Sequence, residues 1–311
     1  MNVNVFVETE GLSREEWLKY RKRGIGGSDV AAILGISKWK SAVGLWLDKT
    51  NQTNEEAEEN EAMQWGNIME PVIRNHFAEV MGKPVVEVKA MLQHPEYPFM
   101  LADVDGLTVD DEGNPAILEI KTASEYKRDE WENGIPAYYQ TQVQHYLCVT
   151  GVAKAYVAVL IGGNSFKMYE VDADAEVQRM LISVEKEFWN KVQNMIRPEI
   201  DGSDAAAKLL DHAYRGGISE QIVLPEEAIE YVDLYIKASA EEDNAKAKKQ
   251  EAANHIKDFM RDYDRAKCLN YTISWKPVSS ERLDSKALKE NEPEIYQKYV
   301  KTSTSRRFTV K

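Results

Sequence analysis

Residues 99–121 constrain the possible fold more than any other segment, because they have the pattern of two adjacent strands. Residues 99–109 are an apolar run of strand composition, and residues 110–115, Asp-Asp-Glu-Gly-Asn-Pro, have the composition of a turn. Residues 117–121, Ile-Leu-Glu-Ile-Lys, complete the pattern as a return strand. The segment therefore predicts a β-hairpin, and with it a sheet, in the first half of the chain.

Charged side chains occupy positions where the two predicted strands face each other. Side chains alternate between the faces of a strand, so Asp103 and Asp105 share one face of the first strand. By the same rule Glu119 and Lys121 share a face of the second strand and lie roughly 7 Å apart along it. We expect Asp105 and Glu119 to meet across the hairpin.

Carboxylates packed this closely need a counter-charge. In an apolar setting two or three of them repel one another, and their pKa values rise until they protonate. A divalent cation removes the conflict: Mg²⁺ prefers hard oxygen ligands and lowers the pKa of a bound water for attack on a phosphodiester. Lys121 would orient or polarise that water. The plainer alternative is an exposed hairpin whose charged side chains face solvent.

The same residues resemble a known nuclease signature. Asp105 followed by Glu119-Ile120-Lys121 is similar to the signature of the PD-(D/E)XK nuclease superfamily. More specifically, the order of segments between residues 10 and 195 resembles the YqaJ-type viral recombinases, which are phage and prophage exonucleases related to the lambda-type exonuclease. The segments that carry this resemblance are residues 21–29, 65–71, 102–106, 119–121, 139–144 and 149–151.

The resemblance implies a cofactor and a set of site residues. It implies Mg²⁺ as the metal, with Mn²⁺ as a substitute, and Gln142 as the glutamine that contacts a metal-bound water or DNA. Asp103 departs from the family pattern, so it is an added metal ligand or a group that supports the ligands, and Gln144 is a further candidate for that supporting role. The implied catalytic residues are Glu70, Asp105, Glu119, Lys121 and Gln142, and the implied metal-contacting residues are Glu70, Asp105, Glu119 and Ile120.

A glycine-rich turn upstream offers a phosphate site. Gly24-Ile-Gly-Gly-Ser28 precedes a predicted helix, and a helix N-terminus supplies free N–H donors and a partial positive charge. Arg21 lies seven residues before Ser28, a spacing that matches the phosphate-contacting Arg and Ser of the resembled family. The resemblance thus implies that Arg21 and Ser28 bind a 5′-phosphate of DNA. The alternative is an ordinary glycine turn followed by a serine N-cap.

Composition is that of a globular protein without a membrane span. Hydrophobic residues make up 43% and charged residues 29% of the 311 residues, and no apolar run approaches the ~20 residues of a membrane helix. The N-terminus has no basic region followed by an apolar segment, so we expect no signal peptide and a cytoplasmic location, in the bacterial host of a phage or prophage. Cys148 and Cys268 are expected to be buried free thiols.

The net charge of −13 argues against a protein that coats DNA, because such proteins need many lysines and arginines. The charge is uneven: residues 1–200 hold 20 Lys and Arg against 32 Asp and Glu, whereas residues 266–311 hold 10 against 5. An acidic run between residues 55 and 61 is expected to be a solvated loop or helix face. An acidic nuclease can still bind DNA if its cations line one channel.

The order of elements predicts an α/β fold, with a restriction-endonuclease-like core in which helices flank a mixed central sheet. We expect an exonuclease domain over residues 1–200 and an α+β C-terminal module over residues 201–311, built around a long helix at 225–262. The other predicted helices are 13–22, 28–34, 39–49, 61–81, 136–150, 173–194 and 283–299, and the other predicted strands are 85–92, 153–161, 166–171, 269–275 and 306–310.

Two of these helices carry further expectations. Pro71 should mark a kink or a start within the helix at 61–81. The buried side of that helix is expected to consist of Ile68, Val72, Phe77 and Val80. The long C-terminal helix thins to alanine in its middle, so it either packs on the core or serves as an arm for a partner or for oligomerisation.

The resemblance implies resection of DNA duplex ends in the 5′→3′ direction, which leaves a 3′ single strand for a single-strand annealing partner. It also implies a ring-like homo-oligomer, often a trimer, that encircles double-stranded DNA. The alternative enzyme is a structure-specific or restriction-like endonuclease, because the same metal centre serves both reactions. Outside the enzymes, the alternative is a non-catalytic DNA-binding recombination scaffold, against which the complete set of Glu70, Asp105, Glu119 and Lys121 argues.

Overall fold

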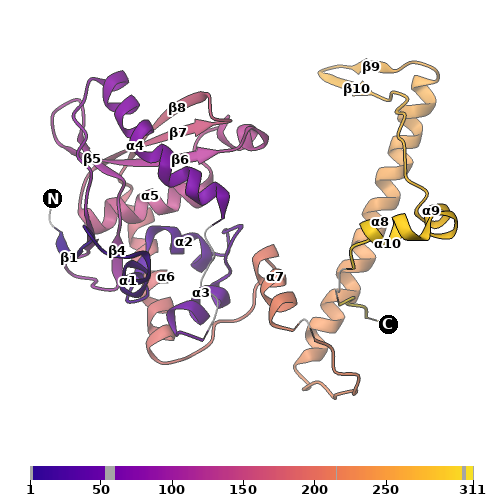
Figure 1. Cartoon of the computed structure of the whole chain (residues 1–311), viewed down its shortest axis with the longest axis horizontal. Helices are drawn as coiled ribbons and strands as arrows, with labels where there is room; N and C mark the ends of the chain where they lie inside the picture. The colour runs from indigo at the N-terminus through magenta and orange to yellow at the C-terminus, as the bar shows by residue number, and fades with distance from the viewer. Residues whose placement is uncertain (1–2, 53–59, 215, 303–305, 311) are drawn as a thin grey trace. The chain divides into compact units, whose positions relative to one another are not determined.

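The structure is a computed structural model that describes residues 3–52, 60–214, 216–302 and 306–310 (Figure 1). The chain divides into two compact units, Met1–His212 and Ala213–Lys311. Helix α7 (Asp204–Ala213) follows the predicted boundary at residue 200 and lies almost entirely in the first unit. Most of the acidic run, residues 55–59, lies outside the described residues.

One sheet of the first unit has the order β5 (Gly106–Val109), β6 (Pro115–Ala123), β7 (Lys154–Ile161), β8 (Ser165–Asp172). β6 and β7 are parallel, and the other neighbours are antiparallel. Parallel neighbours need a crossover connection, which α5 (Ala137–Thr150) supplies. The predicted mixed sheet flanked by helices is therefore confirmed.

A second sheet of the first unit has the order β1 (Asn4–Glu8), β3 (Ala90–Gln93), β4 (Met100–Ala102), β2 (Ile25–Gly26). β4 pairs with β3 antiparallel and with β2 in parallel. The strand predicted at 85–92 is replaced by the shorter β3. Upstream of β3, Val86 makes only an isolated bridge to Leu107.

The prediction of one continuous strand over residues 99–109 is wrong. The chain leaves the sheet that contains β4 at Ala102 and enters the β5–β8 sheet at Gly106. Asp103, Val104 and Asp105 therefore form a junction between the two sheets. Val104 is buried there, with 3% of its surface exposed. The junction frees the backbone around the two aspartates from regular strand pairing, which changes how their side chains are held.

Two helices cover opposite faces of the β5–β8 sheet (Figure 1). On β6, even-numbered residues such as Leu118 pack with α4 (Glu61–Met81), and odd-numbered residues such as Ile117 pack with α5. Because successive side chains point to opposite faces, a sheet covered on both sides buries most residues in the middle of its central strands, as it does Ala116–Ile120 of β6. Glu119 and Lys121 point to the same face of β6 as Ile117 and so lie on the α5 side.

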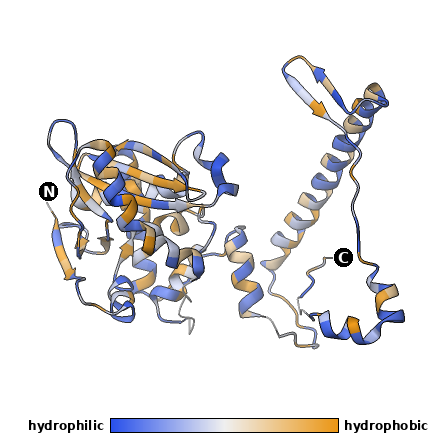
Figure 2. Cartoon of the chain, turned by 45° about the horizontal axis from the view of Figure 1, so that its top comes forward, coloured by the Kyte–Doolittle hydropathy of each residue, from blue (hydrophilic) through white to orange (hydrophobic). Residues whose placement is uncertain are grey.

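The buried face of α4 differs from the predicted one. Ile73 and Phe77 are buried against the sheet, and Met69 is partly buried beside them, so the buried positions recur every four residues. Pro71 lies inside the helix, which continues through it. Of the predicted buried set, Phe77 is buried, whereas Ile68, Val72 and Val80 are exposed. The strands of the central sheet carry many hydrophobic residues (Figure 2). Because α4 packs on this sheet, the sheet determines which face of the helix is buried.

The N-terminal helices begin at residues that satisfy their first N–H groups. α1 (Arg14–Arg21) has the predicted capping box between Ser13 and Glu16. α2 (Gly27–Ile33) corrects a prediction, because its N-cap is Gly26 and Ser28 lies one residue inside it. α3 (Ala42–Lys49) begins after Ser41. α6 (Ala175–Gln193) begins after Asp174, whose side chain accepts from two backbone N–H groups.

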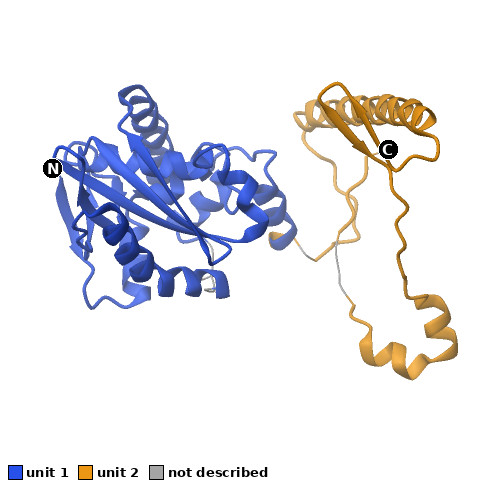
Figure 3. Cartoon of the chain, turned by 90° about the horizontal axis from the view of Figure 1, so that it is seen from above, with its two compact units in different colours: residues 1–212 blue, residues 213–311 orange. Residues whose placement is uncertain are grey.

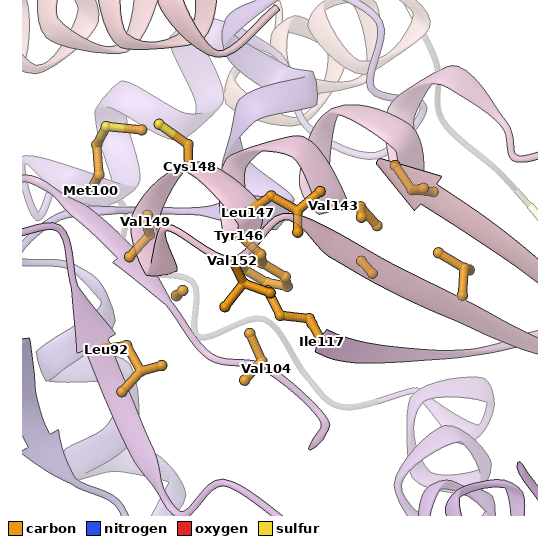
Figure 4. Packing of buried hydrophobic residues seen from close by; sticks show 14 of the residues in the cluster. Leu92, Met100, Val104, Ile117, Val143, Tyr146, Leu147, Cys148, Val149 and Val152 are labelled. Carbon is orange, nitrogen blue, oxygen red and sulfur yellow. The ribbon is translucent and has the colours of Figure 1, made fainter. Parts of the chain in front are cut away.

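The largest core cluster joins α5 to both sheets (Figure 4). Leu147 of α5 lies among Leu92 of β3, Val104 of the junction and Ile117 of β6, and each of these side chains is buried. Cys148 is a buried free thiol, as predicted. Because α5 packs against both sheets, it fixes the position of the junction of residues 103–105 relative to the side chains of α5.

The second unit consists of a long helix, a hairpin and two short helices (Figure 3). The predicted long helix is confirmed as α8 (Ala228–Met260). The hairpin is β9 (Arg265–Cys268) with β10 (Tyr271–Ser274), and the helix predicted at 283–299 is divided into α9 (Ser285–Asn291) and α10 (Pro293–Tyr299).

Two predictions for this unit are wrong. Residues 306–310 form no strand, and Cys268 is exposed because the hairpin that carries it packs on no core. No helix among the described residues is both long enough and apolar enough for a membrane span.

Candidate active site

The hairpin brings Asp105 and Glu119 together at the end of the junction. Oδ2 of Asp105 accepts a hydrogen bond of 2.7 Å from the backbone N–H of Ile120. The strand register, in which Gly106 lies opposite Leu118, places Asp105 beside Glu119. Glu119 has only 1% of its surface exposed. The buried carboxylate of Glu119 therefore lies beside the half-buried carboxylate of Asp105.

Glu119 is held by two side chains, through only one of its oxygens. Oε1 accepts a hydrogen bond of 2.8 Å from Nε2 of Gln142 and lies 2.5 Å from Nζ of Lys121. Oε2 is buried and has no hydrogen-bond partner among the described residues. A buried carboxylate oxygen without a partner is costly, and a cation can satisfy it. Asp105, Glu119, Lys121 and Gln142 are called the hairpin site below.

Glu70 reaches the same region from α4. Its Oε1 bonds to the guanidinium of Arg74, one helical turn further on. Nε of Arg74 donates to the main-chain oxygen of Asp105 at 3.1 Å. Burial first, and then the charge of Asp105, raise the pKa of Glu70 to about 7, against the opposing charge of Arg74. Arg74 thus ties α4 to the junction and holds Glu70 at the rim of the hairpin site.

The acidic side chains raise one another's pKa values. Burial and the charge of Asp105 raise the pKa of Glu119 to about 8, although Lys121 opposes the shift. Burial also raises the pKa of Asp105, against the opposing charge of Lys121 and the N–H of Ile120. Burial lowers the pKa of Lys121, but the charges of Glu119 and Asp105 outweigh it and raise that pKa above its ordinary value. One ammonium does not balance the acids around it.

The donor set fits a hard divalent cation. Carboxylate oxygens come from Asp105 and Glu119, and Ile120, whose side chain is buried among apolar residues, can contribute only its carbonyl oxygen. Among the described residues, no three His, Cys, Asp or Glu side chains converge closely enough to form a metal cage by themselves. Mg²⁺ suits such a site, because it binds through one or two carboxylates and completes its shell with waters and substrate phosphate oxygens.

Arg21 and Ser28 lie together at the start of α2. Nη2 of Arg21 donates to Oγ of Ser28 at 3.0 Å and lies 3.3 Å from Oδ2 of Asp29. The same carboxylate oxygen pairs with Nζ of Lys49 at 2.8 Å. A Cβ at Gly26 would lie 2.7 Å from Nη2 of Arg21, so a larger residue there would push the guanidinium out of this position. Arg21, Ser28, Asp29 and Lys49 are called the Arg21 corner.

Sequence reasoning missed the roles of Asp29 and Lys49 in this corner. Lys49 is the last residue of the apolar helix α3, and its side chain is buried, with 2% exposed. A lysine that ends an otherwise apolar helix is normally read as a solvated charge near the helix C-terminus. Its burial beside Asp29 depends on how α3 packs against α2, which no local pattern indicates.

The Arg21 corner and the hairpin site are linked by aromatic side chains. The hydroxyl of Tyr146 accepts from Nε2 of Gln142 at 3.1 Å, and its ring lies where a Cβ on Gly27 would clash. Nε1 of Trp17 donates to Oδ2 of Asp103 at 2.8 Å, and the guanidinium of Arg21 lies 5.2 Å from the Trp17 ring centre. The hydrogen bond between Asp103 and the Trp17 indole thus ties the junction to α1.

Gln144 does not reach the hairpin site, which corrects its predicted supporting role. Its Nε2 donates to the backbone oxygen of Asp172 at 2.7 Å, and its Oε1 accepts from the N–H of Asp174 at 3.0 Å. Two residues along a helix turn a side chain through about 200°, so Gln144 faces away from Gln142. It ties the end of β8 to the start of α6.

A buried pair on α5 was also missed by sequence reasoning. Nδ1 of His145 lies 2.8 Å from Oε1 of Glu185 on α6, and Nε2 lies 2.9 Å from the backbone oxygen of Leu101 on β4. Both side chains are fully buried. The pair fixes α5 to α6 and to the strand that leads into the junction. A histidine in a mixed polar and apolar helix gives no sequence signal for such a partner.

The chain matches a protein-family model and a known protein. Residues 16–153 match the model of the YqaJ-like viral recombinase domain. A Bacillus subtilis (strain 168) protein described as uncharacterized protein YqaJ is 41% identical over 312 residues, which cover 99% of this chain and 97% of that one. The chain belongs to the YqaJ-like viral recombinase family, as the order of its segments predicted.

Two solved structures that align with more than half of the chain were also found. An alkaline exonuclease from Laribacter hongkongensis is 23% identical, with a TM-score of 0.49, over 58% of this chain and 94% of that one. A phage-related exonuclease from Haemophilus somnus 129PT is 14% identical, with a TM-score of 0.41, over 56% of this chain and 96% of that one.

Proposed function

We propose that this protein is a metal-dependent DNA exonuclease that resects duplex ends. The observation that carries the proposal is the environment of Glu119, a buried carboxylate with one oxygen unpartnered beside Asp105 and Lys121. A second buried acid with one unpartnered oxygen, Glu185, has His145 beside it and no second carboxylate, so it is the crowding of Asp105 and Glu119 that calls for a cation. Membership of a viral recombinase family supports DNA as the substrate.

The residues of the hairpin site have distinct roles in this proposal. Asp105 and Glu119, with the carbonyl of Ile120 and with Glu70 at the rim, would hold Mg²⁺, for which Mn²⁺ can substitute. When bound, the metal supplies charge neutralisation at the phosphate and an activated water. Lys121, kept protonated by its acidic neighbours, orients the attacking water, and Gln142 fixes the orientation of Glu119 through its amide.

The Arg21 corner gives the proposal its polarity. Arg21 and Ser28 would bind the 5′-phosphate of a duplex end, since a guanidinium and a helix N-terminus both favour a phosphate dianion. Cleavage then proceeds 5′→3′ and leaves a 3′ single strand for a single-strand annealing protein, in the cytoplasm of a bacterial host. We include in the proposal a ring-like homo-oligomer, a trimer, that keeps the enzyme on double-stranded DNA.

One assay tests the proposal against its alternatives. End-labelled linear duplex and covalently closed circular duplex are incubated separately with the protein and Mg²⁺, with a chelator as control. We expect loss of the linear DNA only, and only with metal. Cleavage of the circle as well would identify an endonuclease, and binding without cleavage of either would identify a recombination scaffold. Each of these results would overturn the proposed function.

A further inference from the structure

An exposed tryptophan lies beside the hairpin site with two lysines around it. Trp39, in the loop between α2 and α3, has 58% of its surface exposed. Nζ of Lys127 lies 5.5 Å from the centre of the Trp39 ring, and Nζ of Lys38 lies 5.2 Å from the centre of the neighbouring Tyr138 ring. Lys38, Trp39, Lys127 and Tyr138 are called the Trp39 patch.

The Trp39 patch is continuous with Lys121 through one tyrosine. The ring centre of Tyr139 lies 4.9 Å from Nζ of Lys121 and 6.1 Å from the ring centre of Trp39. Tyr139 is itself stacked on the buried ring of Trp131, with centres 5.5 Å apart. The distances from Trp39 to Tyr139 and from Tyr139 to Lys121 add up to an upper limit on the separation of Trp39 and Lys121. This limit corresponds to about three base steps of a DNA strand at 3.4 Å each.

The loop that carries Trp39 is held in place before any ligand binds. Oγ of Ser37 accepts from the N–H groups of Trp39 and Lys40, each at 3.2 Å. The Trp39 ring makes an edge contact with Tyr138, with centres 5.1 Å apart. Nζ of Lys38 and the hydroxyl of Tyr138 both bond to the carboxylate of Glu130, at 2.9 and 2.6 Å. An indole fixed in this way loses little conformational entropy on binding.

The chemistry of the Trp39 patch suits a nucleic acid strand. Aromatic faces stack on any base, and ammonium groups beside them meet the backbone phosphates. Lys38 and Tyr138 both bond to the carboxylate of Glu130. Of the two rings with a lysine over them, Tyr138 is buried and Trp39 is exposed, so Trp39 offers the free face and Lys127 lies over it.

We propose that the Trp39 patch is a stacking platform for an unpaired nucleobase of the DNA strand whose phosphodiester lies at Lys121. The platform deepens the proposed nuclease function and rests on it. Stacking on Trp39 holds the strand within about three nucleotides of the reacting phosphate, and Lys38 and Lys127 meet the phosphates on either side of the stacked base. The platform makes an opened duplex end a better substrate than a closed one.

A double-mutant cycle between protein and DNA tests the platform. Binding is measured in the presence of a chelator, so that no cleavage is needed. The probe is a DNA hairpin with one open end whose terminal nucleotides are unpaired, together with a series in which one terminal base at a time is replaced by an abasic site. The protein is the full chain, as wild type, Trp39→Ala or Trp39→Phe.

Three results are expected. Trp39→Ala weakens binding of the unmodified probe about five- to hundredfold, the range for loss of one stacked base. One abasic position weakens wild-type binding by a similar factor but weakens Trp39→Ala little further, because the two changes remove the same contact. Trp39→Phe keeps most of the wild-type affinity. The control is Trp275→Ala, which removes another exposed tryptophan with a lysine over its ring and should show no such coupling.

The outcomes separate the platform from the nuclease function. Unchanged affinity in Trp39→Ala, independent losses at every abasic position, or equal coupling in Trp275→Ala would each overturn the platform. A wild type that digests linear duplex yet shows independent losses leaves the nuclease function standing and removes only the platform. Equal melting temperatures of wild type and Trp39→Ala exclude unfolding as the cause of any loss.

Discussion

Two buried acids in the first unit, Asp29 and Glu119, have opposite electrostatic surroundings. Burial raises the pKa of Asp29, but Lys49 and Arg21 outweigh it and hold that pKa well below its usual range. Burial raises the pKa of Glu119 to about 8, and Asp105 adds to that shift while Lys121 opposes it. Asp29 therefore has more cationic charge around it than it needs, and Glu119 has less.

The difference separates a structural role from a chemical one. Oδ2 of Asp29 lies beside two cations and accepts from the N–H of Gly26 at 3.0 Å, so Asp29 joins α2 to α3 and positions Arg21. The carboxylate of Glu119 keeps one oxygen unpartnered. A buried carboxylate with two cations beside it needs no further charge, whereas one crowded by a second carboxylate and with a single ammonium nearby favours a bound cation.

The largest effect is expected from breaking the completed network. Asp29→Asn leaves the buried ammonium of Lys49 without its counter-charge, and loss of one partner from a buried pair costs about 3–5 kcal/mol. Urea unfolding should therefore show a large fall in the free energy of unfolding. Glu187→Gln is the matched control, because it breaks an exposed pair with Lys191 and should change the free energy of unfolding little. Equal costs for the two variants would contradict the structural role of Asp29.

At the incomplete network the expected loss is in rate. Asp105→Ala or Glu119→Ala should lower Mg²⁺-dependent cleavage by at least about a hundredfold, because each removes a ligand that the metal needs. Without metal, the unfolding free energy should fall much less than in Asp29→Asn, because Lys121 keeps the remaining carboxylate as a partner in either variant. Digestion of linear duplex and urea unfolding measure the two quantities. A variant that keeps more than a few per cent of the wild-type rate would sink the assignment of the hairpin site.

A smaller effect is expected from the exposed side of the Arg21 corner. If Arg21 and Ser28 bind a terminal phosphate, 5′-phosphorylated ends should be digested about ten- to hundredfold faster than 5′-hydroxyl ends, as expected for a charge-assisted contact of about 1.5–3 kcal/mol. Arg21→Ala should erase most of that preference and leave cleavage itself intact. Initial rates on the two end types provide the measurement.

The control for this prediction is Lys22→Ala, which removes a neighbouring charge that pairs with Asp48 at 3.4 Å. This variant should keep the wild-type preference. Equal wild-type rates on the two end types, or a preference that survives in Arg21→Ala, would show that Arg21 and Ser28 do not bind the terminal phosphate. The glycine-rich segment before Ser28 would then be an ordinary turn.

The contrast between the two acids also marks what a sequence can predict. The capping box at Ser13, the turn at 110–115 and the Glu-Ile-Lys of 119–121 are local patterns, and each led to the correct element. The division of 99–109 between two sheets, the pairing of Asp29 with Lys49 and the buried face of α4 depend on residues far apart in the chain. Local patterns located the acids but could not tell which had partners.

The α4 helix shows the reason in one element. Its apolar residues lie on more than one side, so periodicity alone allows Ile68 and Val72 as well as Ile73 and Phe77 to face inward. The sheet decides between them, because β6 and β7 offer apolar side chains only to the face that contains Ile73 and Phe77. The same choice brings Arg74 and Glu70 to the junction, which is how a packing detail becomes part of the candidate site.

Taken per pH unit, the smallest effect is a difference in pH dependence between the two acids. The pKa of Glu119 in the folded protein, about 8, lies above its ordinary value of 4.5. Between these values the folded state holds a proton that the unfolded state has lost, so the free energy of unfolding falls as pH rises, by up to about 1.4 kcal/mol per pH unit for one proton. The contribution is fully present below the lower value and lost above the higher one. Asp29, with a lowered pKa, adds no slope in this window.

Urea unfolding in a chelating buffer, at several pH values within this window, measures the slope. Glu119→Gln should flatten it, because the amide does not titrate, whereas the exposed-pair control Glu187→Gln should keep the wild-type slope. Mg²⁺ should reverse the trend in the wild type, since metal binding needs ionised carboxylates and so adds stability as pH rises. Identical slopes for wild type and Glu119→Gln, with and without Mg²⁺, would show that Glu119 is ionised in the folded protein before any metal binds. Glu119 would then resemble Asp29, and the contrast between the two acids would be lost.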